Sequence, residues 1–152
     1  MYFSSHPTIK YGNDKVIDIF HRLTPIKHKL DNGVMLELYD IKDSESPEIL
    51  AYNKYGSTEL HWVILLINNI VNVSNDWPMT IREFNKFVHE KYTEPGGVHH
   101  YEDSDGDVVS NTTDYPVTNY TYEERINDNK NKIKLLKPEY IESFVEEFKA
   151  LL

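Results

Sequence analysis

The chain has 152 residues, of which 39% are hydrophobic and 27% are charged, a balance typical of a folded globular protein. Its formal charge of −9 disfavours binding to nucleic acid or to an anionic membrane surface. The chain has no cysteine, which excludes disulfides and cysteine-ligated zinc.

The first 33 residues carry a helical pattern. Apolar residues from Val16 to Leu23 recur at helical spacing, which predicts a helix that begins near Asn13 or Asp14 and ends at Pro25. The turn sequence Asp31-Asn-Gly33 follows this segment.

A strand and a short helix are predicted next. Residues 34–42 alternate apolar and polar side chains, with Leu36 and Leu38 in phase, which is typical of a strand. The sequence Ser46-Pro-Glu48 predicts a helix start, and Gly56 predicts the end of that helix. One face of this helix carries Ile49, Tyr52 and Tyr55.

The segment Leu60–Ile67 is the most apolar stretch of the chain. It is too short for a membrane span, which needs about 20 residues. Ser57 or Thr58 can cap a helix here that is apolar on nearly every side, and Asn68-Asn69 ends it. Because burying one Leu, Ile or Val side chain stabilises a fold by roughly 1.5–3 kcal/mol, we expect Val63–Ile67 to form the centre of the core.

The middle of the chain predicts a helix and a hairpin. Residues 70–79 read as a loop, and Thr80-Ile-Arg-Glu83 is a capping box that starts a helix through about Lys91. Asp105-Gly106 predicts the turn of a β-hairpin within Val98–Ser110. The segment 111–119 is then expected to be a loop.

The C-terminal part predicts two helices around a short strand. A second capping box at Thr121–Glu124 starts a polar helix through about Asn129, and Ile133–Leu136 is a strand candidate. Lys137-Pro-Glu139 starts an amphipathic helix, which either packs on its own domain or lies in a groove of a partner. Its apolar stripe consists of Tyr140, Ile141, Phe144, Val145, Phe148, Leu151 and Leu152.

Two motifs suggest metal sites but lack the required spacing. Counted from Asp103, position four is glycine and position twelve is Asp114, whereas a calcium EF-hand loop needs glycine at six and glutamate at twelve. His99 and His100 are adjacent, and adjacent residues of a strand point to opposite faces. Since the chain also has no glycine-rich phosphate loop and no nucleophile elbow, we expect no catalytic, metal-binding or cofactor-binding residues.

Aromatic residues are frequent, with 11 tyrosines, six phenylalanines and two tryptophans. Such residues pack in cores or form interfaces, and composition does not separate the two roles. Trp62 is expected in the core, whereas Trp77 fits an interface and a cap over the core equally well. The candidate residues for a partner interface are Trp77, Tyr92, Tyr120, Tyr122, Tyr140, Phe144, Phe148, Leu151 and Leu152.

The segment 46–78 contains an ordered series of short motifs. They are Pro47-Glu48, Ala51-Tyr52, Tyr55-Gly56, Trp62 to Leu66, Asn68-Asn69 and Trp77-Pro78. In this order and spacing the segment resembles the baseplate wedge proteins of contractile-tailed, T-even-type bacteriophages. Weaker resemblance extends over most of the chain, including residues 117–148. Asn72 and Lys132 depart from the family pattern, which often has aspartate and arginine there.

We therefore predict an α+β fold: a small LysM-like strand–helix–helix unit with an added β-hairpin and a C-terminal amphipathic helix. The predicted domains are an N-terminal arm with a short helix at 1–33 and a LysM-like helical core at 34–95. The segment 96–152 supplies the hairpin and the C-terminal helices, packed as one domain or as an extension that contacts partners.

The resemblance implies a structural subunit of a tail baseplate wedge, with no enzymatic activity and no cofactor. Its location would be the virion, after assembly in the host cytoplasm. Its partners would be other wedge proteins and hub-proximal proteins in a six-fold assembly around the tail hub, with no nucleic acid or membrane. The alternative is a LysM-type peptidoglycan-binding module of a tail-associated protein.

Replacing both Leu151 and Leu152 with aspartate tests the C-terminal stripe as a docking surface. We expect this double variant to fail in wedge assembly while its isolated domain stays folded, because two charges would have to be buried against the partner. Sizing of the co-expressed complex, with circular dichroism of the isolated chain, measures both properties. Normal assembly of the variant would contradict the prediction.

Overall fold

Residues 7–18, 34–110 and 115–150 are described by the computed structural model of the chain, and they form the mixture of helices and strands expected of an α+β fold. The chain divides into two compact units. Unit 1 comprises Met1–Tyr39, Glu45–Val73 and Ile133–Leu152, and unit 2 comprises Asp40–Ser44 and Ser74–Lys132. The predicted division at 33/34 and 95/96 stays a prediction. No helix among the described residues is long and apolar enough to cross a membrane.

The N-terminal segment forms a β-hairpin and not the predicted helix. Strand β1 (Thr8–Tyr11) pairs antiparallel with β2 (Asp14–Ile17). Gly12 in the turn has φ +62°, a conformation that glycine adopts without steric cost. The prediction is therefore wrong for β2, whose β-branched residues suit a strand, and the remainder of the predicted helix lies outside the described residues.

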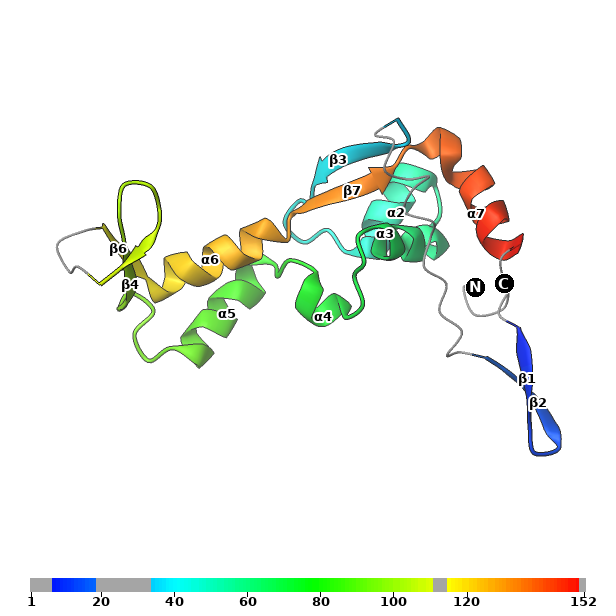
Figure 1. Cartoon of the computed structure of the whole chain (residues 1–152), viewed down its shortest axis with the longest axis horizontal. Helices are drawn as coiled ribbons and strands as arrows, with labels where there is room; N and C mark the ends of the chain where they lie inside the picture. Colours follow the sequence, from blue (N-terminus) through cyan, green and yellow to red (C-terminus); the bar gives the residue numbers. More distant parts are fainter. Residues whose placement is uncertain (1–6, 19–33, 111–114, 151–152) are drawn as a thin grey trace. The chain divides into compact units, whose positions relative to one another are not determined.

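Two strands that are far apart in the sequence, β3 (Leu36–Asp40) and β7 (Lys132–Leu136), pair side by side in Figure 1. Their residues belong to unit 1 except Asp40 and Lys132, which belong to unit 2. Both strands were predicted. Beyond one end of the pair, the Lys137 N–H donates to the Met35 carbonyl at 2.9 Å. Beyond the other end, the Ile41 N–H donates to the Asn131 carbonyl at 2.9 Å. The two bonds give the same antiparallel register.

This register determines which side chains of β3 are covered. Leu36 lies opposite Leu136 and packs against the core, but Leu38 is 83% exposed. On the other face of the strand, Glu37 accepts a hydrogen bond from Lys54 Nζ at 2.9 Å. The alternation of apolar residues thus identifies the strand correctly but does not identify its buried face.

Helix α2 (Pro47–Tyr55) begins and ends as predicted. The Ser46 hydroxyl accepts from the Ile49 N–H at 3.3 Å, and Gly56 ends the helix at φ +74°. The fully buried residues of this helix are Leu50 and Ala51. The face that carries Ile49 and Tyr52 is exposed, at 49% and 61%.

The apolar stretch forms a 3₁₀ turn, η2 (Thr58–Leu60), followed by α3 (His61–Ile67). The Ser57 side chain caps the turn by accepting from the Glu59 N–H. Val63 and Ile64 have no exposed surface, whereas residues 65–67 are only half-buried. The predicted core centre is confirmed for its first two residues.

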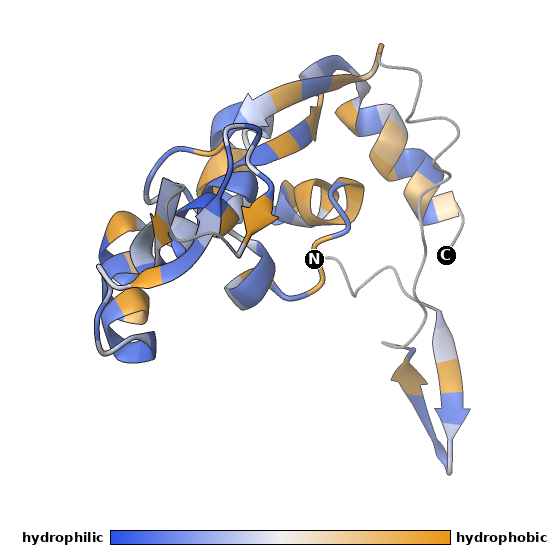
Figure 2. Ribbon diagram, turned by 60° about the vertical axis from the view of Figure 1, so that its left-hand side comes forward, coloured by the Kyte–Doolittle hydropathy of each residue, from blue (hydrophilic) through white to orange (hydrophobic). Residues whose placement is uncertain are grey.

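The C-terminal segment forms the 3₁₀ turn η3 (Pro138–Tyr140) and helix α7 (Ile141–Ala150). Ile141 belongs to a core cluster with Val63 and Leu136, against which Phe144 and Val145 pack. The ribbon of α7 in Figure 2 alternates between hydrophobic and hydrophilic residues as an amphipathic helix should.

Two side chains, one from α2 and one from the residue that follows α3, bond to β7. The Asn68 amide donates from Nδ2 to the Lys134 carbonyl and accepts from the Lys134 N–H, each over 2.8 Å. The Tyr55 hydroxyl donates to the Leu136 carbonyl at 2.9 Å, and burial raises the pKa of Tyr55 to about 12. These bonds attach α2 and α3 to the sheet through polar groups in addition to the apolar core.

Unit 2 combines helices with a three-stranded sheet. Its described elements are α4 (Val73–Asp76, which starts at the last residue of unit 1), α5 (Ile81–Lys91), β4 (Val98–Glu102), β5 (Val108–Val109), β6 (Tyr115–Thr118) and α6 (Asn119–Asn129). The strand order is β5-β4-β6, with both pairs antiparallel. The capping box of α5 and the hairpin turn with Gly106 at φ +86° confirm two predictions.

Two sequence predictions in unit 2 need correction. Part of the expected loop is β6, which pairs with β4 even though it contains Pro116. Proline is tolerated there because β6 is an edge strand. Helix α6 starts before Thr121, since the Thr118 side chain is the cap and accepts from the Thr121 N–H at 3.1 Å.

Truncation of Leu136 and Leu38, which lie on one face of the β3–β7 pair, tests the register of these two strands. Leu136→Ala should lower the free energy of unfolding by about 2–5 kcal/mol, because it leaves a cavity in the core. Leu38→Ala, the matched control on the paired strand, should change it by less than about 0.5 kcal/mol. Urea unfolding of both variants measures the difference, and equal losses would contradict the register.

Candidate interaction surfaces

The aromatic residues of unit 1 pack on one another. Trp62 on α3 contacts two rings of α7, with ring centroids 4.7 Å from Phe148 and 6.3 Å from Phe144. Phe148 is buried, and Tyr140 packs against the core cluster. The described part of the apolar stripe therefore lies against its own unit, while Leu151 and Leu152 lie outside the described residues. A role of the stripe toward a partner stays a prediction.

The aromatic candidates of unit 2 also have internal contacts. Trp77 is 8% exposed, which favours the prediction that it covers the core and disfavours an interface role. The Tyr120 ring meets Phe84 edge to face at 5.2 Å, and its hydroxyl donates to Asn85 Oδ1 at 3.3 Å. Such contacts position these rings in the unit without using a partner.

A buried carboxylate joins α5 to α6 within unit 2. Glu123 is 5% exposed and accepts hydrogen bonds from Lys91 Nζ and from the Tyr92 hydroxyl, each at 2.7 Å. Burial by itself raises the pKa of Glu123, but these bonds outweigh burial and the pKa is lowered. The same bonds raise the pKa of Lys91 and of Tyr92. The Tyr92 hydroxyl thus helps to hold the buried Glu123 carboxylate in place.

The two adjacent histidines lie together, contrary to the expectation for a regular strand. A β-bulge between Val98 and His100 breaks the alternation of β4, and Nδ1 of His99 lies 2.8 Å from Nδ1 of His100. One ring must donate and the other accept. The His99 ring also stacks on Tyr122, with centroids 3.9 Å apart.

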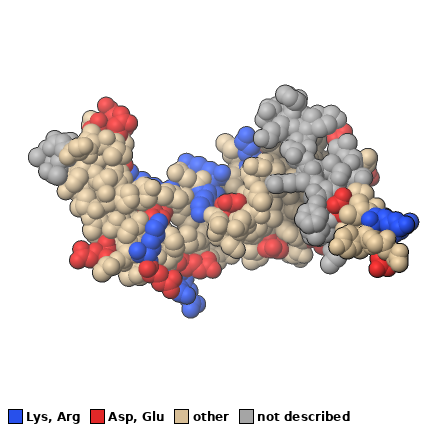
Figure 3. Space-filling model, turned by 60° about the horizontal axis from the view of Figure 1, so that its bottom comes forward, with Lys and Arg blue, Asp and Glu red and all other residues tan. Residues whose placement is uncertain are grey.

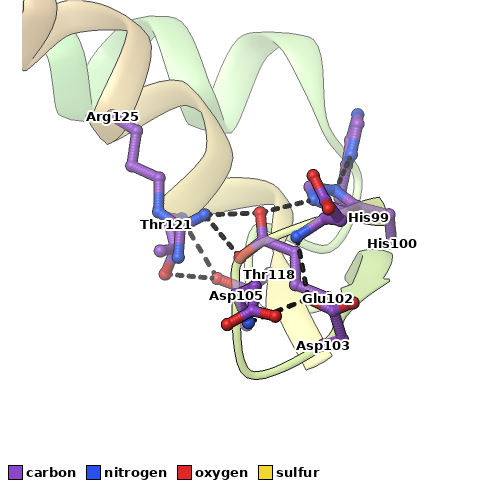
Figure 4. A network of polar contacts seen from close by, with 9 residues as sticks. His99, His100, Glu102, Asp103, Asp105, Thr118, Thr121 and Arg125 are labelled. Atoms are coloured by element: carbon purple, nitrogen blue, oxygen red, sulfur yellow. Dashed lines mark hydrogen bonds and ion pairs between the residues drawn. The ribbon is translucent and has the colours of Figure 1, made fainter. Parts of the chain in front are cut away.

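The histidine pair continues into an ion pair, which Figure 4 shows from close by. His100 Nε2 lies 3.0 Å from Glu102 Oε1, and Arg125 Nη1 donates to both oxygens of Glu102 at 2.6 and 2.8 Å. Hydrogen bonds from Arg125 and then from His100 lower the pKa of the Glu102 carboxyl. These side chains satisfy one another and tie β4 to α6.

The acidic turn between β4 and β5 is held by its own backbone. Asp103 Oδ1 accepts from the N–H groups of Asp105 at 2.9 Å and Asp107 at 3.0 Å. Among the described residues there is no group of three His, Cys, Asp or Glu side chains that could hold a metal ion.

The exposed apolar residues form a different set from the predicted aromatic candidates. All eight strand residues of β1 and β2 are exposed. Four of them have large hydrophobic side chains, namely Ile9, Tyr11, Val16 and Ile17. Leu38 on β3 is likewise an exposed apolar residue. Sequence reasoning missed the hairpin because the same apolar residues also fit a helix; the turn at Gly12 was the available signal.

Charged side chains on the face drawn in Figure 3 occur as separate groups of both signs, with no continuous basic field. A protein that binds nucleic acid through its backbone phosphates presents such a field. The face drawn in Figure 3 lacks such a field.

Comparison with known protein families gives a match over most of the chain. A family model described as base plate wedge protein 53, a phage family, matches residues 4–149. The search of curated proteins gives no match for the chain.

Replacement of the buried Glu123 tests the network around it. Glu123→Gln should lower the free energy of unfolding by about 1–3 kcal/mol at pH 7, because charge-assisted hydrogen bonds are lost. The lowered pKa means that the stabilisation is complete above the pKa of an unfolded glutamate, about 4.3, and disappears as the pH falls through the folded-state pKa. The difference between wild type and variant should therefore narrow below about pH 4.

The matched control is Glu90→Gln on α5. Glu90 is exposed and lies 3.7 Å from Lys86, so its loss should cost at most about 0.5 kcal/mol. Chemical unfolding from pH 3 to 8 measures both variants. An equal effect at the two positions would rule out the network as a source of stability.

Proposed function

We propose that this chain, which belongs to the base plate wedge protein 53 family of phages, joins neighbouring wedge proteins during baseplate assembly. The family is structural, and membership implies a place in the tail baseplate of the virion. The match covers most of unit 1 and all of unit 2. The role proposed here is binding by buried surface, without catalysis.

The observation that carries the proposal is the hairpin β1–β2. Its register sets Ile9 directly opposite Val16, and Tyr11 extends the same face. These side chains are 43%, 40% and 76% exposed. A two-stranded hairpin is at best marginally stable alone in water, and burial of its apolar face on another protein would stabilise it.

The other face of the hairpin has an electrostatic reason to bind. Lys10 lies directly opposite Lys15, and like charges at such positions destabilise a pair of strands. A partner with acidic groups at this face would remove the repulsion. The hairpin thus offers one face with Ile9, Tyr11, Val16 and a single carboxylate, Asp14. Its other face carries the two lysines beside Thr8 and Ile17.

A hairpin is too small to make a stable interface alone, since such interfaces bury at least about 1,000 Å² in total. We therefore place further contacts on both units, with wedge and hub-proximal proteins as partners in a six-fold assembly around the hub, formed in the host cytoplasm. The peptidoglycan alternative finds no support in the comparisons, and we expect no binding to peptidoglycan fragments.

Charges placed on the apolar face of the hairpin test this function. In the double variant Ile9→Asp with Val16→Asp, two carboxylates would have to be buried in the interface, so the complex with the wedge proteins of the same phage should be lost. Co-expression with those proteins followed by size-exclusion chromatography measures the complex. A free chain that still unfolds cooperatively would show that units 1 and 2 are intact.

The control is Val108→Asp, which places a charge on another exposed apolar residue of a hairpin, 72% exposed on β5. It should assemble like the wild type. Wild-type chain that forms no complex with any wedge protein would refute the proposed function, and assembly of the hairpin variant would exclude β1–β2 as the contact.

A further inference from the structure

The hairpin β1–β2 has backbone groups that point away from both of its strands. The Asp18 N–H donates to the Pro7 carbonyl at 2.8 Å, one residue beyond the paired strands. Bonded and non-bonded pairs alternate along an antiparallel ladder, so Lys10 and Lys15 face each other as a non-bonded pair. The N–H and carbonyl groups of such a pair point outward, and no described residue bonds to those of Lys10 or Lys15. Each edge of the hairpin is therefore a template for a third strand.

Strand β1 separates its apolar and polar side chains onto opposite faces. Ile9 and Tyr11 lie on one face and are 43% and 76% exposed. Thr8 and Lys10 lie on the other face, because side chains alternate along a strand. A strand beside β1 would therefore meet apolar side chains on one face and polar or positively charged side chains on the other.

Strand β2 does not separate its side chains in this way. Asp14 shares a face with the apolar Val16, and Ile17 shares a face with Lys15. A strand beside β2 would meet a carboxylate among apolar contacts on one face and an apolar residue next to a lysine on the other. The chemistry of the two edges thus favours β1 as the edge that accepts a strand of simple alternating pattern.

The lysine pair restricts which strand can bind. A lysine on an open edge ordinarily keeps other strands away. In a non-bonded pair the Cα atoms are only about 4.5 Å apart, so the charges of Lys10 and Lys15 repel each other. Neither lysine forms an ion pair with any described residue. A strand that brings a carboxylate to this face would remove the repulsion, whereas a neutral or basic strand would not.

We propose that the outer edge of β1 binds an extended segment of another baseplate protein, in which apolar and acidic residues alternate. Its apolar residues would lie beside Ile9 and Tyr11, and an acidic residue would lie beside Lys10, on the face that also carries Lys15. The added strand would also stabilise a hairpin that is marginal alone. The inference rests on the proposed function, since it names the chemistry of one partner.

A second copy of this chain is a poorer occupant of the edge. Pairing of β1 with β1 of another copy would bring further lysines beside Lys10 and Lys15. The sequence Leu36-Glu37-Leu38 has the alternating pattern, but its Glu37 already accepts a hydrogen bond from Lys54 Nζ at 2.9 Å. A different protein can supply a carboxylate that has no such partner.

Amide hydrogen exchange of the full chain tests the edge without any substitution. The probes are the purified wedge proteins of the same phage, added one at a time. In the complex that uses this edge, exchange at the Thr8 and Lys10 amides should slow by about tenfold or more, because each N–H gains an acceptor. The Lys15 and Ile17 amides, at the other edge of the hairpin, are the internal control and should slow less. If no wedge complex protects the two β1 amides beyond the two β2 amides, the inference is overturned.

A pair of proline variants tests the backbone of each edge. Lys10→Pro and Lys15→Pro each remove one lysine and one outward N–H, and proline is tolerated where that N–H faces solvent. They are matched in charge and in position along the hairpin, but they alter opposite edges. Lys10→Pro should therefore weaken binding about tenfold more than Lys15→Pro, because it removes a donor to the added strand. Titration of each variant with the bound wedge protein measures the affinities.

A neutral variant tests the acidic character of the partner. Lys10→Gln with Lys15→Gln removes both charges and also removes their repulsion in the free hairpin. An acidic segment should bind this variant about tenfold more weakly than the wild type at low salt, and the difference should shrink as the salt concentration rises. The control is Arg82→Gln with Lys86→Gln, two exposed positions on α5, which should bind like the wild type. Equal or tighter binding of the lysine variant would overturn the acidic partner.

The outcomes separate this inference from the proposed function. A chain that binds a wedge protein equally well as Lys10→Pro and as Lys15→Pro keeps the proposed function and loses this edge. A chain that binds no wedge protein loses both. Self-association of the chain alone, with slower exchange at the Thr8 and Lys10 amides, would assign the edge to a second copy and overturn the inference.

Discussion

The antiparallel pairing of β3 with β7 is the contact on which unit 1 depends. It closes a loop from Met35 to Lys137. Closing so long a loop costs conformational entropy, and contacts that form only after closure must offset that cost. The pairing of two strands alone does not offset this entropy cost. The compensating stabilisation comes from the core of Val63, Leu136 and Ile141 and from the bonds of Asn68 to β7. Strand pairing and helix packing are therefore one cooperative event.

This closure explains why part of the architecture was not evident from the sequence. Periodicity marks residues 34–42 and 133–136 as strands, but it carries no information on which strands pair. The predicted strand–helix–helix unit therefore names no partner for its strand at 34–42, whereas in the structure β3 pairs with β7, which begins only at Lys132. Contacts over such separations depend on tertiary packing, which local patterns do not record.

Local sequence signals predicted the structure correctly where a residue type has one specific structural role, such as a helix cap or a turn. Ser46 accepts a backbone N–H at the start of α2, Thr80 and Glu83 cap each other's backbone, and Gly106 occupies a conformation that favours glycine. Patterns failed where two structures share them. The apolar residues of β2 fit a helix as well as a strand, and a bulge at His99 reversed the alternation on which the separation of the two histidines rested.

The candidate site shows the same division between chemistry and context. Aromatic residues suit cores and interfaces for one reason, their large apolar area, so Phe148 and Tyr120 were reasonable candidates that the fold uses internally. The exposed apolar residues are different ones, Leu38 on β3 and Ile9 on the hairpin. Each obeys the pattern of a buried strand face but has no cover within the described part of the chain. Such a mismatch between pattern and burial supports the proposal that a neighbouring baseplate protein covers the hairpin, because burial of its exposed apolar side chains would stabilise it.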